Sequence, residues 1–140
     1  MTSASPDSRS GPTEAGDPLV LVVDDDERNL RLARDVLRAA GLRTLEAATG
    51  RAAIALATAE RPDVILLDLR LPDLDGAAVA RELRGDPRTA EIPVVALSAL
   101  QARGDEDWLL AAGFAGYLAK PIDVGDFPGQ VRGYCTGVAS

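Results

Sequence analysis

The chain of 140 residues contains no histidine, one cysteine and one lysine. Without histidine there can be no histidine triad, histidine general base or histidine metal ligand, and one cysteine leaves almost nothing to build a zinc site from. Cys135 cannot form an internal disulfide, which fits a reducing compartment such as the cytoplasm. The chemistry that remains uses carboxylates, hydroxyls, a single lysine and a hard metal ion.

The chain also lacks long apolar runs and basic runs. No stretch approaches the roughly 20 apolar residues of a membrane helix, and the N-terminus lacks the pattern of a secretory signal. The 15 basic residues are scattered among 22 acidic ones, for a net charge of −7. We therefore expect a cytoplasmic protein that binds neither nucleic acid nor a membrane.

The sequence indicates one domain with two tails. Residues 1–17 are polar and rich in Ser, Pro and Gly, which predicts a disordered tail, and residues 137–140 form a short C-terminal tail. Between them, residues 18–136 alternate five times between a short apolar run and a helical pattern. This alternation predicts an α/β fold, a doubly wound parallel sheet with five strands and five helices. The strands are expected at about 19–23, 43–47, 64–67, 94–97 and 116–119, and the helices at about 27–40, 50–60, 76–84, 105–112 and 124–134.

Glycine and proline mark the ends of the predicted helices. Gly41 and Gly113 follow helical patterns and are expected to stop them. The last helix carries Val124, Phe127, Val131 and Tyr134 at helical spacing, but it also contains glycines and Pro128. Proline is tolerated only near the first turn of a helix, so this helix is predicted to be the weakest.

Two of the apolar runs end in aspartate. Leu19 to Val23 is followed by Asp24, Asp25 and Asp26, and Val64 to Leu67 is followed by Asp68. Ligands of such sheets bind beyond the carboxyl ends of the strands. If the two strands are neighbours, their carboxylates converge, and their mutual repulsion is costly unless a cation lies among them.

Two further strands end in polar residues that suit phosphate. Ser98 follows the fourth apolar run, and Lys120, the only lysine, follows the fifth. Asp24 and Asp25 could hold Mg²⁺, which prefers oxygen ligands, and Asp68 could form an aspartyl phosphate. Each residue alone has an ordinary explanation, since strands often end at solvent in polar residues. Their joint placement at one edge of the sheet predicts a phosphoryl-transfer site.

With these residues the chain resembles the response-regulator receiver domains of two-component signalling, over about residues 18–136. The motifs that carry the resemblance are Val-Val-Asp-Asp at 22–25, Asp68 with Leu-Pro-Asp at 71–73 and Asp-Gly at 75–76, Pro93 through Ser98-Ala99, and Gly-Tyr-Leu-Ala-Lys-Pro at 116–121. Within this family the chain looks most like single-domain receivers of the chemotaxis and cell-cycle type and receivers attached to hybrid histidine kinases. The resemblance implies the flavodoxin-like receiver fold with strand order 2-1-3-4-5.

The resemblance also implies roles for individual residues. Asp68 would accept a phosphoryl group from a histidine kinase or a histidine phosphotransfer protein. Mg²⁺, or Mn²⁺, would be held by Asp24, Asp25, Asp68 and the backbone carbonyl of Arg70. In this family a receiver catalyses only its own phosphorylation and dephosphorylation, so we expect a signalling domain rather than an enzyme.

Further implied roles concern the phosphoryl group and the switch. Ser98, Ala99 and Lys120 would bind phosphate oxygens, Ser98 and Tyr117 would move as the switch, and the bond before Pro121 would be cis. The switched face, made by the fourth helix, the fifth strand and the fifth helix, would control an unknown downstream protein, with the chain a monomer or weak homodimer. Glu106 and Leu110 lie one helical turn apart, and the same stripe continues to Phe114 and Tyr117, so these four residues are predicted to make the output face. Leu110 and Phe114 are expected to be exposed, and Leu109 and Ala112 to face the sheet.

Several alternatives stay open at this point. A phosphatase of the haloacid dehalogenase type would use Asp24 as the nucleophile, although the chain lacks the expected threonine and cap domain. A receiver-like module that is never phosphorylated is a third reading. Arg70 could hinder the water that attacks the aspartyl phosphate, or it could be an ordinary solvated arginine. A receiver of this kind could bind an effector, control a kinase or pass phosphate along a relay.

Overall fold

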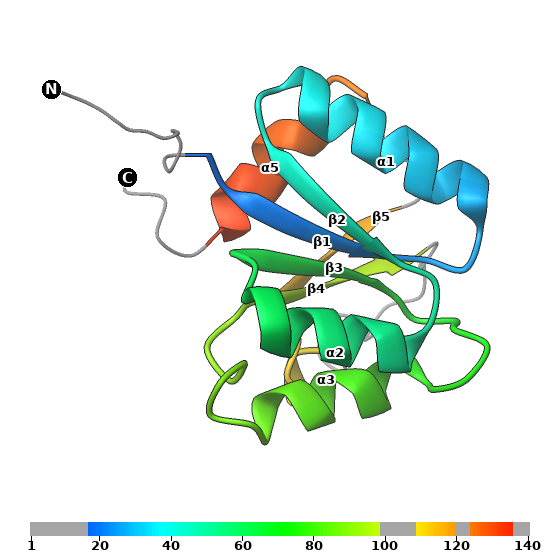
Figure 1. The fold of residues 1–140 in the computed structure, drawn as a ribbon, viewed down its shortest axis with the longest axis vertical. Coiled ribbons are helices and arrows are strands. Elements are labelled where there is room, and N and C mark those ends of the chain that lie inside the picture. The colour runs from blue at the N-terminus through cyan, green and yellow to red at the C-terminus, as the bar shows by residue number, and fades with distance from the viewer. Residues whose placement is uncertain (1–16, 99–108, 120–123, 136–140) are drawn as a thin grey trace, which may run out of the picture.

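The structure is a computed structural model that describes residues 17–98, 109–119 and 124–135 (Figure 1). Its centre is a sheet of five parallel strands in the order β2-β1-β3-β4-β5. This order confirms the predicted doubly wound sheet and its flavodoxin-like topology. The strands are β1 (Leu19–Val23), β2 (Arg43–Ala47), β3 (Val64–Asp68), β4 (Val94–Ser98) and β5 (Gly116–Ala119).

Helices cover both faces of the sheet. Figure 1 shows α1 (Glu27–Ala39) and α5 (Phe127–Tyr134) on one side and α2 (Gly50–Glu60) and α3 (Gly76–Arg84) on the other. Residues 109–111 are helical and end the predicted fourth helix; its start falls outside the described residues. Within the part of the chain that the structure describes, no helix is both long and apolar enough to cross a membrane.

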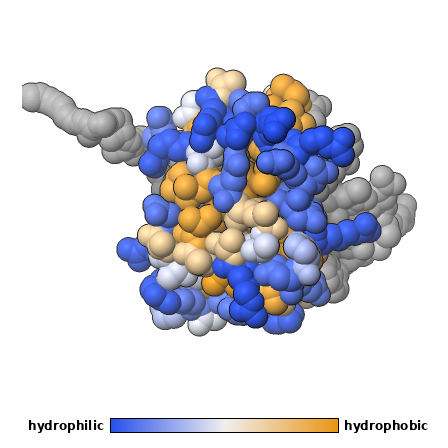
Figure 2. All heavy atoms as spheres, turned by 45° about the vertical axis from the view of Figure 1, so that its right-hand side comes forward, coloured by the Kyte–Doolittle hydropathy of each residue, from blue (hydrophilic) through white to orange (hydrophobic). Residues whose placement is uncertain are grey.

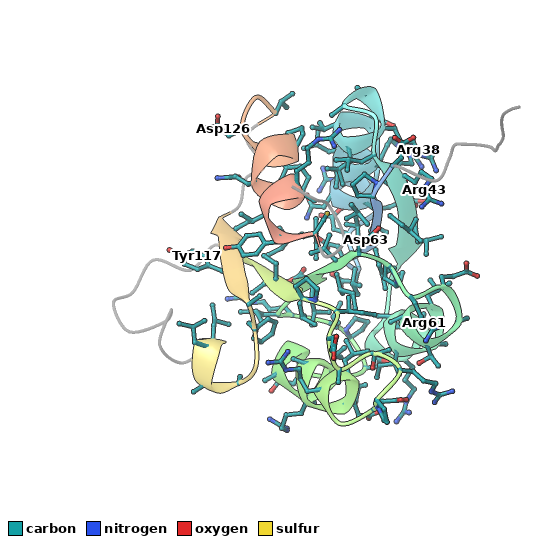
Figure 3. The ribbon with its side chains drawn as sticks, turned by 90° about the vertical axis from the view of Figure 1, so that its left-hand side faces the viewer. Arg38, Arg43, Arg61, Asp63, Tyr117 and Asp126 are labelled. Carbon is teal, nitrogen blue, oxygen red and sulfur yellow. The ribbon has the colours of Figure 1, made fainter. Side chains whose placement is uncertain are left out.

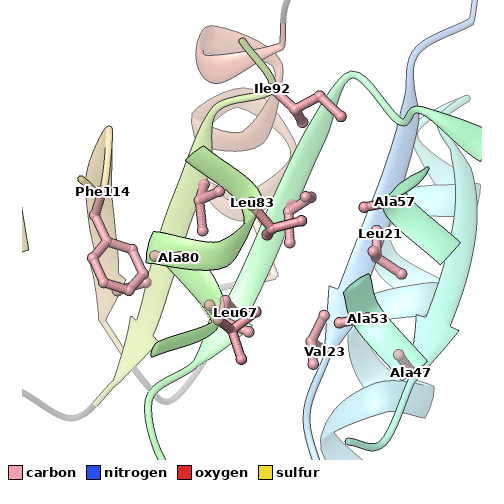
Figure 4. Packing of buried hydrophobic residues seen from close by; sticks show 14 of the residues in the cluster. Leu21, Val23, Ala47, Ala53, Ala57, Leu67, Ala80, Leu83, Ile92 and Phe114 are labelled. Atoms are coloured by element: carbon pink, nitrogen blue, oxygen red, sulfur yellow. The ribbon is translucent and has the colours of Figure 1, made fainter. Parts of the chain in front are cut away.

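The sheet divides the core into two clusters, because side chains alternate along a strand. Leu21 and Val23 of β1 face the cluster under α2 and α3, and Val20 and Val22 face the cluster under α1 and α5. Figure 4 shows the first cluster. All four side chains are fully buried, as expected for a parallel strand covered on both sides.

Polar residues cap the first three helices. Asp26, Thr49 and Asp75 are the N-caps of α1, α2 and α3, and their side chains accept hydrogen bonds from backbone amides of the first turn. At the C-terminal ends, Gly41 follows α1 and Gly113 follows the helical residues 109–111. Their φ values are 91° and 103°. These left-handed conformations confirm that both glycines stop helices.

Helix α5 begins three residues later than the sequence pattern predicts. Val124 lies in a turn and is 59% exposed, whereas Phe127 and Val131 are buried. Pro128 lies in the first turn of the helix, where proline is tolerated. An earlier start would have moved Pro128 further into the helix, against the carbonyl of residue 124. At Gly116, the first residue of β5, a Cβ would collide with the phenol of Tyr134 on α5.

The surface is largely polar. Figure 2 shows one face on which hydrophilic side chains surround an apolar patch. The large hydrophobic residues that are exposed in the described part of the chain are Leu32, Leu110 and Val124. They lie on or beside three different helical segments.

Candidate functional site

Three carboxylates meet at the carboxyl edge of the sheet. One oxygen each from Asp24, Asp25 and Asp68 lies within 4.8 Å of the others. Strands β1 and β3 are hydrogen-bonded neighbours in which Val23 pairs with Leu67, so both strands end at the same level. Asp24 is 1% exposed and Asp68 is 7% exposed, while Asp25 faces solvent. The structure thus brings together the three acidic residues that the sequence singled out.

Backbone hydrogen bonds position Asp24. Its Oδ1 accepts from the backbone N–H of Asp26 at 2.9 Å, and its own N–H donates to the carbonyl of Ala47 at 3.1 Å. Asp26, the third aspartate of the run, caps α1 by accepting from the N–H of Arg28 at 2.9 Å. The run therefore contributes two side chains to the cluster and one to a helix end.

The loop after β3 positions Asp68. Oδ1 of Asp68 accepts from the backbone N–H of Arg70 at 2.9 Å, and Arg70 forms an antiparallel bridge with Asp75. The amide of Gly76 donates to the carbonyl of Leu69 at 3.3 Å. A Cβ at Gly76 would lie 2.9 Å from the Cα of Leu69, which explains why glycine stands here. The loop is therefore closed tightly next to the acidic cluster.

Asp73 has a role that its sequence pattern does not indicate. Its Oδ1 accepts from the N–H of Gly50 at 2.7 Å and its Oδ2 from the N–H of Arg51 at 3.0 Å. The hydrogen bond from Gly50 is the main reason why the pKa of the Asp73 carboxyl lies below its usual value. The two partners are more than 20 residues away along the chain, so no local sequence signal could have found the contact.

The carboxylate cluster fits a divalent cation. Three carboxylates within 4.8 Å repel one another, and two of them are largely withheld from water. Hard cations such as Mg²⁺ and Mn²⁺ take oxygen ligands of this kind. The donor set therefore suits the metal ion that the sequence analysis expected, and it does not suit a soft metal.

The phosphate-binding and switch residues are described only in part. Ser98 is the last residue of β4 and pairs with Ala119, so its backbone lies at the same edge as Asp68; its side chain, like Ala99, Glu106, Lys120 and Pro121, lies outside the described residues. Tyr117 is half-buried on β5 and packs against the cluster under α2 and α3. Figure 3 shows it on the edge strand of the sheet.

The prediction for one residue of the output face, Phe114, is wrong. Leu110 is 57% exposed, as predicted, and Leu109 is buried. Phe114, however, is only 3% exposed and packs in the core cluster of Figure 4. The helix ends before it, and Gly113 turns the chain with a positive φ. The helical spacing from Glu106 and Leu110 therefore does not continue to residue 114.

Residues 20–132 match the sequence profile of the response regulator receiver domain. The chain belongs to this family. A relative of this receiver domain is the polar-differentiation response regulator DivK of Brucella anthropi, 37% identical over 115 residues that cover 82% of this chain and 94% of DivK. This membership decides against the phosphatase alternative.

Solved receiver structures have the same fold. The chemotaxis response regulator CheY4 of Vibrio cholerae matches with a TM-score of 0.79 and 26% identity, covering 84% of this chain and 98% of CheY4. The receiver domain of the sensor histidine kinase PA1611 from Pseudomonas aeruginosa matches with a TM-score of 0.76 and 34% identity, covering 84% and 97%. That structure holds a magnesium ion in its active-site cleft. The present chain is thus a receiver domain of two-component signalling.

Proposed function

We propose that this receiver domain accepts a phosphoryl group on Asp68 in a reaction that requires Mg²⁺ or Mn²⁺. The donor is a phosphohistidine on a histidine kinase or a histidine phosphotransfer protein. The observation that carries the proposal is the cluster of Asp24, Asp25 and Asp68 oxygens within 4.8 Å at the carboxyl edge of the sheet. The magnesium ion in the related PA1611 receiver supports it.

In this proposal Asp68 is the nucleophile. A carboxylate oxygen of Asp68 attacks the phosphorus, the bond from phosphorus to the histidine nitrogen breaks, and that nitrogen leaves with the electron pair. The hydrogen bond from the Arg70 amide to Oδ1 of Asp68 holds the attacking carboxylate in one orientation. Asp24, Asp25, Asp68 and the carbonyl of Arg70 would hold the metal ion, which would supply positive charge against the carboxylates and the incoming phosphate.

The remaining predicted residues would read the phosphorylated state. We propose that Ser98, Ala99 and Lys120 bind the phosphoryl oxygens and that Tyr117 moves with Ser98. Tyr117 is half-buried on the edge strand, and in this proposal phosphate shifts an existing equilibrium between two positions of its side chain. The output face that contacts a downstream protein then comprises Glu106, Leu110 and Tyr117, without Phe114.

Phosphorylation can be tested with a small phosphodonor. Wild type, Asp68→Asn and Asp24→Asn are incubated with acetyl phosphate, with Mg²⁺ or with EDTA, and their intact masses are measured. We expect one added phosphoryl group on wild type with Mg²⁺, none on Asp68→Asn and little on Asp24→Asn. Addition to wild type that does not depend on Mg²⁺, or that survives Asp68→Asn, contradicts the proposal. No addition at all would favour a module that works without phosphate.

A further inference from the structure

We propose that Asp73 is a positioning residue for the magnesium site, because it ties the loop that carries Arg70 to the first turn of α2. The inference rests on the proposed function. Asp73 itself lies outside the carboxylate cluster and would touch neither the metal ion nor the phosphoryl group. It acts through the backbone on both sides of that cluster.

The contact is made by both oxygens of one carboxylate. Oδ1 of Asp73 accepts from Gly50 and Oδ2 from Arg51, at 2.7 and 3.0 Å. These are the first two amides of α2, which have no partner within the helix. The N-terminus of a helix also favours a negative charge. The N-cap Thr49 accepts from the amide of Ala52 instead, so Thr49 and Asp73 share the amides of the first turn.

The first turn of α2 is linked to a proposed metal ligand through a short stretch of backbone. Ala47, the last residue of β2, accepts a hydrogen bond from the backbone N–H of Asp24 at 3.1 Å. Only Ala48 and Thr49 separate Ala47 from Gly50. A shift of the α2 N-terminus would therefore reach the backbone of Asp24 through a very short connection.

On its other side, Asp73 belongs to the loop that follows Asp68 and carries Arg70. It lies between Arg70 and Asp75, which form a bridge with each other, and the amide of Arg70 donates to Asp68. The carboxylate of Asp73 thus links the backbone next to Asp24 with the loop next to Asp68. This link runs outside the sheet, in addition to the pairing of β1 with β3.

Close packing makes this link stiff. A Cβ on Gly50 would lie 2.7 Å from Cγ2 of Val79 and 3.0 Å from Cβ of Leu74. The first turn of α2 is therefore in contact with both the loop and α3, without room for another methyl group. Because this packing leaves little room for movement, the two hydrogen bonds of Asp73 fix the position of the loop relative to the N-terminus of α2.

Without the Asp73 carboxylate, the loop is expected to lose its two hydrogen bonds to α2. The distances between the proposed metal ligands would then no longer be fixed. Removal of groups that orient metal ligands commonly weakens metal affinity about 10-fold or more. We expect Asp73→Ala to weaken Mg²⁺ binding by about this factor. Phosphorylation by acetyl phosphate should then need more Mg²⁺, and its rate at saturating Mg²⁺ should change much less.

The test measures Mg²⁺ binding directly on the full chain. Mg²⁺ is titrated into wild type, Asp73→Ala and Asp73→Asn, and the dissociation constant is obtained from backbone amide chemical shifts, which also report whether each variant is folded. Asp73→Asn keeps one carbonyl acceptor and should lie between the other two. Asp86→Ala is the matched control, since Asp86 caps a local turn through the amide of Arg88, after the far end of α3.

The outcomes separate this inference from the proposed function. Weaker Mg²⁺ binding in Asp73→Ala, with Asp86→Ala like wild type, supports the positioning role. Equal dissociation constants in wild type and a folded Asp73→Ala overturn it and leave the proposed function standing; if Asp73→Ala does not fold, equal constants in wild type and Asp73→Asn overturn it instead. A wild-type chain that binds no Mg²⁺ and gains no phosphoryl group overturns both. Equal weakening in Asp73→Ala and Asp86→Ala also overturns it, since a general loss of stability would then explain the effect.

Discussion

The aspartates around the site have two kinds of role: three form the carboxylate cluster, and others hold the N-terminal ends of helices. Asp24, Asp25 and Asp68 lie at the carboxyl ends of two buried strands and form the carboxylate cluster. Asp26 and Asp75 cap helices, and Asp73 holds the first turn of α2. The cluster could be predicted because strand ends are visible in the sequence. The contact of Asp73 could not, since it depends on how two distant loops approach one another.

The side chain of Arg70 can be tested for an effect on the hydrolysis of the aspartyl phosphate. Its side chain is exposed and its backbone bonds to Asp68. If the side chain covers the phosphoryl group, Arg70→Ala should shorten the lifetime of the aspartyl phosphate several-fold, because water reaches phosphorus more easily. The lifetime is measured by intact mass after removal of the phosphodonor. Arg81→Ala, on the exposed side of α3, is the control, and an unchanged lifetime in Arg70→Ala would show an ordinary solvated arginine.

Cys135 is expected to be unreactive in the folded chain. Burial raises the pKa of its thiol to about 11, and its Sγ donates to the carbonyl of Val131 at 3.4 Å. A raised pKa keeps the thiol protonated, so at pH 8 only about one molecule in a thousand carries the reactive thiolate. Iodoacetamide should therefore modify the native protein slowly at pH 8, and faster as the pH approaches 11. The chain unfolded in urea is the control, and equally fast modification of both forms would be the contrary result.

At the scale of elements, the predicted bounds of α1, α2 and α3 agree with the structure to within about one residue, whereas the predicted start of α5 does not. Gly41 and Gly113 carry a clear signal because their positive φ values suit glycine. The start of α5 was misplaced because apolar spacing continues to Val124, while Pro128 restricts where the helix can begin. Phe114 was misplaced because helical spacing says nothing about a turn at the preceding glycine. In both cases a local backbone constraint overrode the periodic pattern.

Replacing glycine by alanine should have opposite effects on the stability of the protein at two positions near helix starts. At Gly129 in α5 a Cβ meets nothing within 4 Å, so Gly129→Ala should stabilise the protein by up to about 1 kcal/mol through helix propensity. At Gly50 a Cβ would lie 2.7 Å from Val79, so Gly50→Ala should destabilise it by about 1–3 kcal/mol. Urea unfolding of both variants measures the difference. Stabilisation by Gly50→Ala would contradict the close packing of α2.

At the scale of the whole molecule, the topology could be predicted because each apolar run is short and each helical pattern separates two of them. That alternation leaves few arrangements, and the resemblance to receivers selects one order. The expected boundaries at residues 17 and 136, and the cytoplasmic location, stay predictions. The same holds for the roles of Lys120, Ala99 and Pro121, which lie outside the described residues.

Metal binding should be visible in the stability of the whole chain. A ligand that binds only the folded state stabilises it, and at about 100 times the dissociation constant the gain is about 2.7 kcal/mol. For a domain of this size, Mg²⁺ should then raise Tm by about 10 °C. Thermal unfolding followed by circular dichroism measures this, with NaCl of equal ionic strength as the control. The rise should disappear in Asp25→Asn; a rise of the same size with NaCl would instead reflect general charge screening.

The contact of Gly116 with Tyr134 constrains how this sequence can change over evolution. Any side chain at position 116 would enter the space that the phenol of Tyr134 occupies. A mutation at position 116 requires the half-buried phenol of Tyr134 to move, so it is expected to be better tolerated after position 134 has taken a smaller residue. Position 134 can shrink first at the expense of a cavity. The two positions are therefore expected to vary together among descendants of this gene, and in that order.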